Sequence, residues 1–493
     1  MKTLEALSFD NRYARLPDIF YTRHQPMPLQ GQFLIHFNQD VAHRLGLDPS
    51  EAERDDFVDI VTGAKPLPGY EPLAMCYSGH QFGHYVPRLG DGRALLLGQI
   101  TTESGEYWDW HLKGGGLTAY SRDGDGRAVL RSSIREYLCS AAMQGLGIAT
   151  TQALCLTGSE EEVYRENIET GAMILRVAPS HIRFGSFEFL YYTERFDALK
   201  ILADYVIEYH YPQLREQPQP YLGLLREVVQ VTATMIAQWQ AVGFAHGVMN
   251  TDNLSVLGLT MDYGPFGFLD TYQPGFICNH SDHSGRYAFD RQPEIALFNL
   301  SCFAQTLLPL LEGTPEAAGE QAMAVLKSFQ PQYQSCYDAL MRSKLGLATS
   351  RAEDGALVDE LLALMAKNQV DYTILFRALG QAGITQRNTS ARDLFLDREA
   401  CDLWLEKYQA RLDHEAGDSV ERCARMNAIN PKRVLRNYLA EVAIRRAEDD
   451  QDYREIDQLM RALKNPYTDM PEFEHYADHP PAWATQVEVS CSS

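Results

Sequence analysis

The sequence predicts an α+β fold in which a small sheet-plus-helix lobe is followed by a larger helical lobe. Between residues 71 and 200, the runs RALLLGQI, EYWDWHLK and AMILRVAPS have the length and composition of β-strands. Among them, RAVLRSSIREYLCSAAMQGLG repeats apolar residues at helical spacing and ends in glycines, as helices do. From about residue 203 the pattern is predominantly helical.

Two further segments complete this organisation. The first seventy residues contain aromatic and proline-rich turns, and we expect them to wrap around the small lobe. The last stretch is polar and proline-rich, and we expect an extended tail. The predicted division is an N-terminal extension, a small lobe, a helical lobe and a tail, at residues 1–70, 71–200, 201–464 and 465–493.

Within the helical lobe, YLGLLREVVQVTATMIAQWQAVG predicts a long, largely apolar helix that ends at Gly243. Two short strand-like pieces, LSVLG and LTMDYG, are expected shortly after it. Beyond Pro293 helices should dominate to about residue 464.

Charge and composition exclude several classes of protein. The 493 residues are 45% hydrophobic and 22% charged, so the chain can bury large cores. Its 66 acidic and 44 basic side chains give a net charge of -22, which repels nucleic-acid backbones and anionic membranes. We therefore expect neither as a partner, and a nucleotide would need a local cationic pocket.

The N-terminus and the cysteines indicate a cytoplasmic protein. The first residues are acidic early and lack an uninterrupted apolar core, so we expect no signal or transit peptide. Nine cysteines without a CxxC pair argue against a zinc site and against a secreted disulfide framework.

The stretch HGVMNTDN has the outer frame of a protein-kinase catalytic loop, with His246 first and Asn253 seven residues later. The Asp that kinases place two residues after the His is replaced by Val248. That Asp accepts the proton of the attacking hydroxyl, so ordinary γ-phosphoryl transfer would lack one of its parts. Asp252 follows four residues later, which leaves open an inactive kinase or another reaction.

Two elements upstream match a kinase-like nucleotide site. In RLGDGRALLLG, Gly90 and Gly92 would let backbone N–H groups approach a nucleotide and Arg93 adds charge, although such a hairpin is more often a simple turn. Lys113 ends an expected strand and Glu136 lies on the next helix, in the order of the kinase Lys–Glu ion pair. Taken singly, each would more often be a solvated surface residue.

Asn253 and Asp262 flank the expected short hairpin, and Asp262 opens an Asp-Tyr-Gly triplet where kinases have Asp-Phe-Gly. Amide and carboxylate oxygens on adjoining turns are what Mg²⁺ requires when nucleotide phosphates complete its coordination. The spacing from His246 therefore predicts a divalent metal site.

Further charged residues surround these motifs. Arg176 and Arg183 lie seven apart across a proline-containing turn and would converge on one anion, although each could instead bind a carboxylate. Asp125 and Gly126 directly precede the helix, where its N-terminus favours a nucleotide.

Five long blocks of the sequence resemble the selenoprotein O family, and the match runs nearly from end to end. The blocks are YSGHQFGHYVPRLGDGRALLLGQI, LKGGGLTAYSRDGDGRAVLRSSIREYL, VAPSHIRFGSFEF, HGVMNTDNLSVLGLTMDYGPFGFLD and NPKRVLRNYLAEVAI. Members are protein adenylyltransferases with a protein-kinase-like two-lobe fold. The resemblance implies that ATP binds in reversed orientation, so that AMP is transferred to a hydroxyl of a protein.

The resemblance also assigns roles, residue by residue. Asp252 is the implied catalytic base, and Asn253 and Asp262 are the implied ligands of Mg²⁺ or Mn²⁺. The implied substrates are ATP and proteins with Ser, Thr or Tyr hydroxyls, with UTP open as a second donor. The implied nucleotide contacts are Gly90, Gly92, Arg93, Lys113, Asp125, Gly126, Arg176, Arg183 and Asp262. GGG after Lys113, where GAG is commoner in the family, is a small departure.

Two other classes of function stay open at this point. A protein or small-molecule kinase would transfer the γ-phosphate, against which Val248 already counts. A catalytically silent pseudokinase would bind partners through its helical region, yet it would not need Lys113, Glu136, Asn253 and Asp262 together.

Two cysteines lie where they would control access to the site. Cys278 is in a polar segment after the Asp-Tyr-Gly triplet and Cys491 is third from the end of the tail, so we expect both to be exposed. Members of the resembling family place a selenocysteine or cysteine at this tail position. On that resemblance we predict a reversible disulfide between Cys278 and Cys491.

Overall fold

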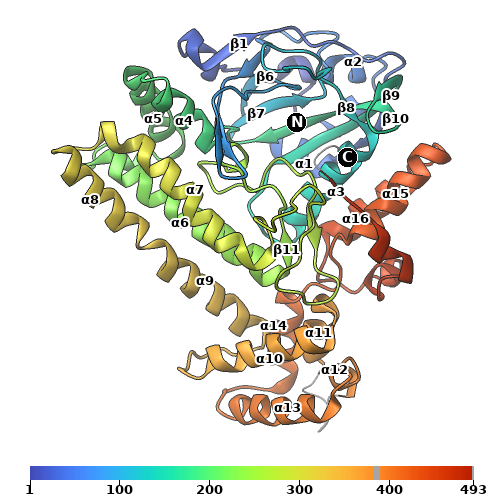
Figure 1. The fold of residues 1–493 in the computed structure, drawn as a ribbon. Helices are drawn as coiled ribbons and strands as arrows, with labels where there is room; N and C mark the ends of the chain where they lie inside the picture. The colour runs from blue at the N-terminus through green and yellow to red at the C-terminus, as the bar shows by residue number, and fades with distance from the viewer. Residues whose placement is uncertain (382–388, 491–493) are drawn as a thin grey trace.

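The computed structural model describes residues 1–381 and 389–490 and confirms a mixed α+β fold with one large antiparallel sheet and many helices (Figure 1). The strand order in the sheet is β1-β3-β6-β7-β10-β9-β2, and β8 pairs with β10. Its strands are β1 (Tyr21–Arg23), β2 (Phe33–Phe37), β3 (Leu73–Met75), β6 (Ala94–Thr101), β7 (Tyr107–Lys113), β8 (Ala128–Val129), β9 (Gln152–Tyr164) and β10 (Ile168–Ala178).

The three runs that the sequence predicts as strands form the centre of this sheet. Strands β6 and β7 make a hairpin whose register pairs Ala94 with Lys113, and β7 then pairs with β10. All residues of β7 after Tyr107 are buried, which fits a strand covered on both faces. Lys113 therefore enters the interior from the last position of a central strand.

The N-terminal extension supplies both edges of the sheet. Strand β1 pairs with β3, and β2 pairs with β9 on the opposite side. Along the sequence, helices α1 (Gln39–Leu45) and α2 (Phe57–Val61) lie between β2 and β3. The first seventy residues are thus part of the sheet, in addition to covering it.

Helix α3 (Leu130–Gly145) is the helix that the sequence predicts, and it lies between the sheet and the end of the chain. It contacts β9 and β10 on one side, and α15 (Asn437–Asp449) and α16 (Arg454–Lys464) on the other (Figure 1). At Gly145 helices α3 and α16 approach so closely that a Cβ on this glycine would lie 2.1 Å from the backbone oxygen of Leu463. The C-terminal helices therefore return to the helix that covers the sheet.

The remaining helices follow one another from β10 onward. Helix α6 is central among them and packs against α7 and α9. The helices are α4 (Phe184–Tyr192), α5 (Phe196–His210), α6 (Pro220–Val242), α7 (Gln292–Leu307), α8 (Pro315–Leu326), α9 (Phe329–Lys344), α10 (Asp354–Asn368), α11 (Tyr372–Leu379), α12 (Thr389–Arg392), α13 (Arg398–Leu412) and α14 (Ser419–Ile429).

Helix α6 ends one residue before Gly243, as the sequence predicts. The stretch that resembles a kinase catalytic loop, residues 246–253, follows shortly after it. Gly243 has a φ of +77° and accepts the left-handed conformation that closes the helix. The chain then forms β11 (Phe244–Ala245), which pairs with β12 (Gly267–Phe268). Two smaller strands, β4 (Gly79–Gln81) and β5 (His84–Val86), form a separate hairpin near this loop.

The prediction of two strand-like pieces at LSVLG and LTMDYG is wrong. They form only isolated bridges, between Ser255 and Arg183 and between Thr260 and Thr150. Each piece pairs with a distant segment instead of with the other, so no hairpin forms between Asn253 and Asp262.

The tail is not simply extended. Residues 471–477 and 482–486 form short 3₁₀ turns, and Phe473, Tyr476 and Ala484 are buried. These apolar anchors hold the tail on the molecule because their burial offsets the loss of chain entropy.

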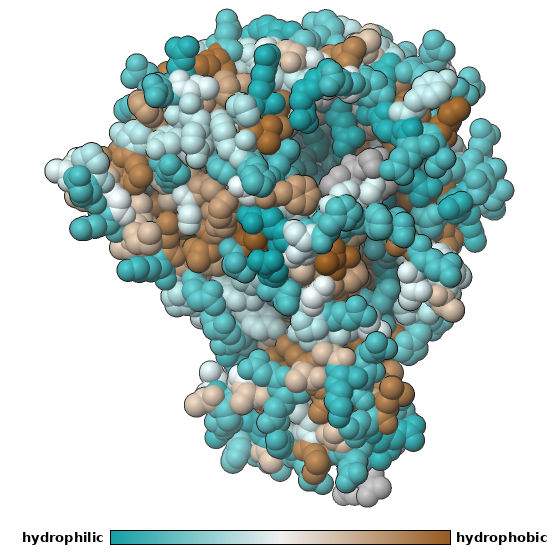
Figure 2. Space-filling model, in the orientation of Figure 1, coloured by the Kyte–Doolittle hydropathy of each residue, from teal (hydrophilic) through white to brown (hydrophobic). Residues whose placement is uncertain are grey.

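Hydrophilic side chains cover most of the face in Figure 2, and apolar ones occur in small separate groups. Across residues 1–381 and 389–490, no helix has the length and apolar character that a membrane span requires.

We expect Gly243→Ala to destabilise the protein. The left-handed φ costs an L-residue about 1–2 kcal/mol, and a Cβ would lie 2.9 Å from Cδ1 of Tyr372. The midpoint of urea unfolding should fall. Gly319→Ala is the matched control: it lies in α8 with open space around it, so the same change should leave stability unchanged or raise it by up to about 1 kcal/mol. A Gly243→Ala midpoint equal to that of Gly319→Ala would contradict the expectation.

Candidate active site

A cavity of about 570 Å³ lies between the β6–β7 side of the sheet and the segment that follows α6. The structure brings to its wall all eleven residues that the resemblance assigns to nucleotide, metal or catalysis. They are Gly90, Gly92, Arg93, Lys113, Asp125, Gly126, Arg176, Arg183, Asp252, Asn253 and Asp262.

The floor of the cavity is a buried network of charged side chains. Lys113 forms an ion pair with Glu136 of α3, as the sequence predicts. Arg176 on β10 lies 3.2 Å from the same carboxylate and donates at 2.9 Å to Asp262, which also accepts from Arg183 at 2.6 Å. Three cations and two carboxylates are thus bonded to one another on the floor, with Asp91, Asp252 and Arg93 as further charged residues of the cavity.

The carboxylates of this network are ionised. Burial opposes the charge on Asp262, but Arg183, Arg176 and Lys113 together hold its pKa well below the usual range. Burial likewise opposes ionisation of Glu136, and Lys113 and Arg176 hold its pKa below the ordinary value. The sequence leaves open whether Arg176 and Arg183 bind an anionic ligand or a carboxylate. In this structure both bind the carboxylate of Asp262.

Asp262 and Asn253 lie side by side. Asp262 adopts a φ of +55°, which is uncommon outside glycine, and Asn253 Nδ2 lies 3.3 Å from Asp262 Oδ2. That contact turns the amide oxygen of Asn253 away, and among the described residues this buried oxygen has no hydrogen-bond partner. An orphaned buried acceptor beside a carboxylate fits a hard divalent cation.

Asp252 lies in the cavity wall and is almost completely buried, with 6% of its surface exposed. Burial raises the pKa of its carboxyl to about 7. Gln81 of β4 donates to Oδ2 at 3.2 Å, while Oδ1 has no partner among the described residues. A carboxylate near half-ionisation at neutral pH, with one free oxygen, suits a general base.

With this geometry in place, comparison with known proteins identifies the family. The family described as Protein adenylyltransferase SelO matches residues 3–464. The chain belongs to this SelO family. Curated relatives, each named "Protein nucleotidyltransferase YdiU" and each matched over 100% of both chains, come from Thioalkalivibrio sulfidiphilus at 56% identity over 493 residues and Myxococcus xanthus at 54% over 495. A third, from Pseudomonas fluorescens, is 50% identical over 496 residues.

A nucleotidyltransferase of the SelO family implies ATP as substrate, and ATP in turn implies a divalent metal. The donors present fit such an ion. Asn253 Oδ1 is a buried acceptor without a partner among the described residues, and Asp262, whose two oxygens accept from Arg176 and Arg183, lies beside it in the cavity wall.

Sequence reasoning missed three residues of this SelO-family site. Arg176 is held from behind by His111, whose Nδ1 accepts from Arg176 at 2.8 Å and whose Nε2 lies 3.1 Å from Asp91. Burial lowers the pKa of His111 to about 4, so it is neutral and accepts from the guanidinium. Gln81, the third, orients Asp252. Gln81 and Asp91 lie inside one of the blocks that carry the family resemblance and His111 directly precedes another, which was the available signal.

The glycines have packing reasons of their own. Gly90 has a φ of +72°, and a Cβ there would lie 2.3 Å from the ring of Tyr120. At Gly126 a Cβ would lie 2.2 Å from the backbone of Gly116. Asp125 already forms a bidentate ion pair with Arg165, at 2.7 and 2.9 Å. These residues shape the loop over the cavity, whatever they contact in a ligand.

The expectation that Cys278 is exposed is wrong. It is buried at 7% exposure, its thiol donates to the Ala245 oxygen at 3.5 Å, and it packs so tightly that a Cβ on Gly247 would lie 2.7 Å from its sulfur. Cys278 and Asn279 are buried beneath Gly247, while their neighbours Ile277 and His280 are exposed. Cys491 lies outside the described residues, although Val489 accepts a hydrogen bond from His280 N at 2.9 Å.

We expect Glu136→Gln to cost about 3 kcal/mol of unfolding free energy, because removing one partner leaves buried cations without their counter-charge. Urea unfolding measures the loss. In the control, Glu360→Gln, the carboxylate pairs with Lys407 on the surface and should contribute less than about 1 kcal/mol. Equal effects of the two changes would show that the buried network does not stabilise the fold.

Proposed function

We propose that this chain transfers AMP from ATP to Ser, Thr or Tyr hydroxyls of proteins and releases pyrophosphate. The observation that carries the proposal is the convergence of three buried cations, Lys113, Arg176 and Arg183, on the cavity floor. Pyrophosphate leaves with more negative charge than a γ-phosphoryl transfer develops at one oxygen, so these cations would stabilise its departure.

In the proposed reaction the hydroxyl oxygen of the protein substrate attacks the α-phosphorus of ATP. The bond from the α-phosphorus to the oxygen bridging to the β-phosphate breaks, and the hydroxyl proton passes to Asp252. The burial that raises the pKa of Asp252 to about 7 supports this role, because a base of that pKa accepts a proton readily at neutral pH.

The cavity residues divide between nucleotide and metal. Arg176 Nε and Arg183 Nη2 are buried donors without a partner among the described residues, so phosphate oxygens would satisfy them. We assign the remaining nucleotide contacts to Gly90, Gly92, Arg93, Lys113, Asp125, Gly126 and Asp262. Asn253 and Asp262 would hold Mg²⁺ or Mn²⁺, which when bound neutralises phosphate charge.

We further propose the finer description of the fold as kinase-like, with two lobes and boundaries near residues 70, 200 and 464. The ion pair from a central strand to the helix beside the sheet supports it, since kinases place Lys and Glu in these positions. His246 supports it as well: its ring bonds the Met261 oxygen at 2.9 Å and so fixes the residue before Asp262.

The proposal is tested by incubating the full-length protein and a protein substrate with ATP labelled at either phosphate. Label should enter protein from α-labelled ATP and not from γ-labelled ATP, and intact mass should rise by one AMP. Incorporation from γ-labelled ATP would identify a kinase, and none from either would identify a silent scaffold. α-Labelled UTP in the same assay decides whether UMP is also transferred.

Two aspartate variants separate the proposed roles in that assay. Asp252→Ala should keep ATP binding and lose transfer by about 10²- to 10⁴-fold, because it removes only the base. Asp262→Ala should lose metal-dependent ATP binding itself. Equal losses of ATP affinity in the two variants would contradict this division.

We also propose that Cys278 and Cys491 form a reversible disulfide that holds the tail across the segment after Asp262, in the cytoplasmic setting that the cysteine content predicts. The hydrogen bond between His280 and Val489 supports it, since each of these residues is two positions from one of the cysteines. The two thiols would pass two electrons and two protons to a disulfide oxidant such as oxidised glutathione.

Reduction should therefore raise the activity of oxidised wild-type protein by opening access for protein substrates. Cys491→Ser should be active without reductant and insensitive to it, while Cys423→Ser, a buried cysteine on α14, should respond like wild type. Non-reducing peptide mapping identifies the bond. An identical response of wild type and Cys491→Ser to reductant would exclude a regulatory tail thiol.

A further inference from the structure

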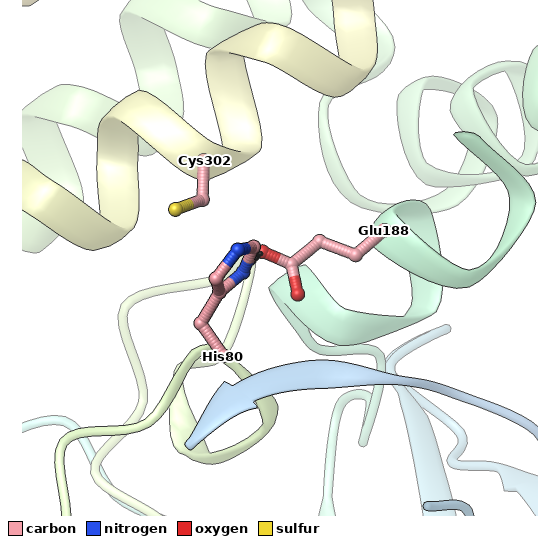
Figure 3. A group of neighbouring side chains, drawn as sticks. All are labelled: His80, Glu188 and Cys302. Carbon is pink, nitrogen blue, oxygen red and sulfur yellow. Dashed lines mark hydrogen bonds and ion pairs between the residues drawn. The ribbon is translucent and has the colours of Figure 1, made fainter. Parts of the chain in front are cut away.

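Three side chains from different elements meet at a point that does not line the nucleotide cavity (Figure 3). They are His80 on β4, Glu188 on α4 and Cys302 on α7. A ring nitrogen of His80, a carboxylate oxygen of Glu188 and the sulfur of Cys302 all lie within 4.8 Å of one another. In Figure 3 the carboxylate of Glu188 lies against the imidazole, and the side chain of Cys302 extends from its helix above the ring.

The cluster places a carboxylate in a poorly hydrated part of the molecule. Glu188 is fully buried, and among the described residues its ion-pair partner is His80, whose Nδ1 lies 2.9 Å from Oε1. A buried carboxylate with only one titratable partner is a place that a cation would stabilise.

The chemistry of the donors selects the cation. One nitrogen, one oxygen and one sulfur are the mixed set that zinc accepts, whereas Mg²⁺ prefers the oxygens found at Asn253 and Asp262. With metal–ligand distances of about 2.0–2.3 Å, a tetrahedral ion needs its ligand atoms roughly 3.6 Å apart, so each must move by no more than about 1 Å. Three protein ligands leave a fourth position for water.

We propose that His80, Glu188 and Cys302 form a binding site for Zn²⁺ or a similar thiophilic divalent cation, distinct from the metal site of the nucleotide. On binding, the imidazolium and the thiol each release a proton to water, and bonds form from the metal to nitrogen, sulfur and oxygen. No electron is transferred. Cys302 is half-buried.

A cation here would brace the catalytic loop. The second oxygen of Glu188 accepts from Thr251 Oγ1 at 2.8 Å, and the same hydroxyl accepts from the backbone N–H of His80 at 2.7 Å. Thr251 directly precedes Asp252, and Gln81, which orients Asp252, directly follows His80. The ion would therefore join β4, α4 and α7 behind the proposed base and stabilise the folded protein.

The test uses full-length, reduced, metal-free protein titrated with Co²⁺, which reports thiolate ligation by a near-ultraviolet charge-transfer band. Wild type should develop the band with one equivalent of Co²⁺, and Zn²⁺ should abolish it by displacement. Cys302→Ser should lose the band. Cys336→Ser is the matched control, because Cys336 is another half-buried helical cysteine, on α9, and should keep the band.

Absence of the band in wild type, or its persistence in Cys302→Ser, would overturn the proposal. Saturating Mg²⁺ and ATP should leave the band unchanged; its loss would place the ion in the nucleotide cavity and also overturn the proposal. Zn²⁺ should raise the thermal unfolding midpoint of wild type and Cys336→Ser but not of Cys302→Ser. Should Cys302→Ser fail to bind ATP, His80→Gln takes its place, and an unchanged band in that variant rejects the site.

Discussion

The structure depends above all on the buried ionic network that joins Lys113, Glu136, Arg176, Asp262 and Arg183. Each of these charges would be costly alone in a dehydrated interior, and each is tolerated because it has at least one opposite partner. The network also connects a central strand, the helix on the sheet and the segment after α6. The same ion pairs thus form the cavity floor and hold the sheet against the helices.

The parts of this network that sequence reasoning anticipated are those with a local pattern. Lys113 ends a strand with a clear strand composition, and Glu136 lies on a helix with clear periodicity, so their pairing follows from the order of the two elements. The engagement of Asp262 by Arg176 and Arg183 was only one of two alternatives, since sequence cannot decide whether an arginine meets a carboxylate or a ligand.

Other features depend on contacts that no local pattern encodes. The pKa of Asp252 near 7 comes from burial under Gly79 and Gly185, which lie far away in sequence. The polar neighbours of Cys278 predict an exposed loop, yet the cysteine packs beneath Gly247. The pieces LSVLG and LTMDYG have strand-like composition, but their bridging partners are remote and each bridge stands alone. Tertiary context overrides propensity at each of these positions.

The edge strands β1 and β2 have a consequence for how the chain is made. Residues 21–37 are synthesised before their pairing partners in β3 and β9, and α15 and α16, which pack on α3, are synthesised long after it. Pairings of such long sequence separation are slow to form because loop closure must precede them. The growing chain therefore carries an unpaired β2 until β9 has been made, a period during which chaperone binding would protect it from aggregation.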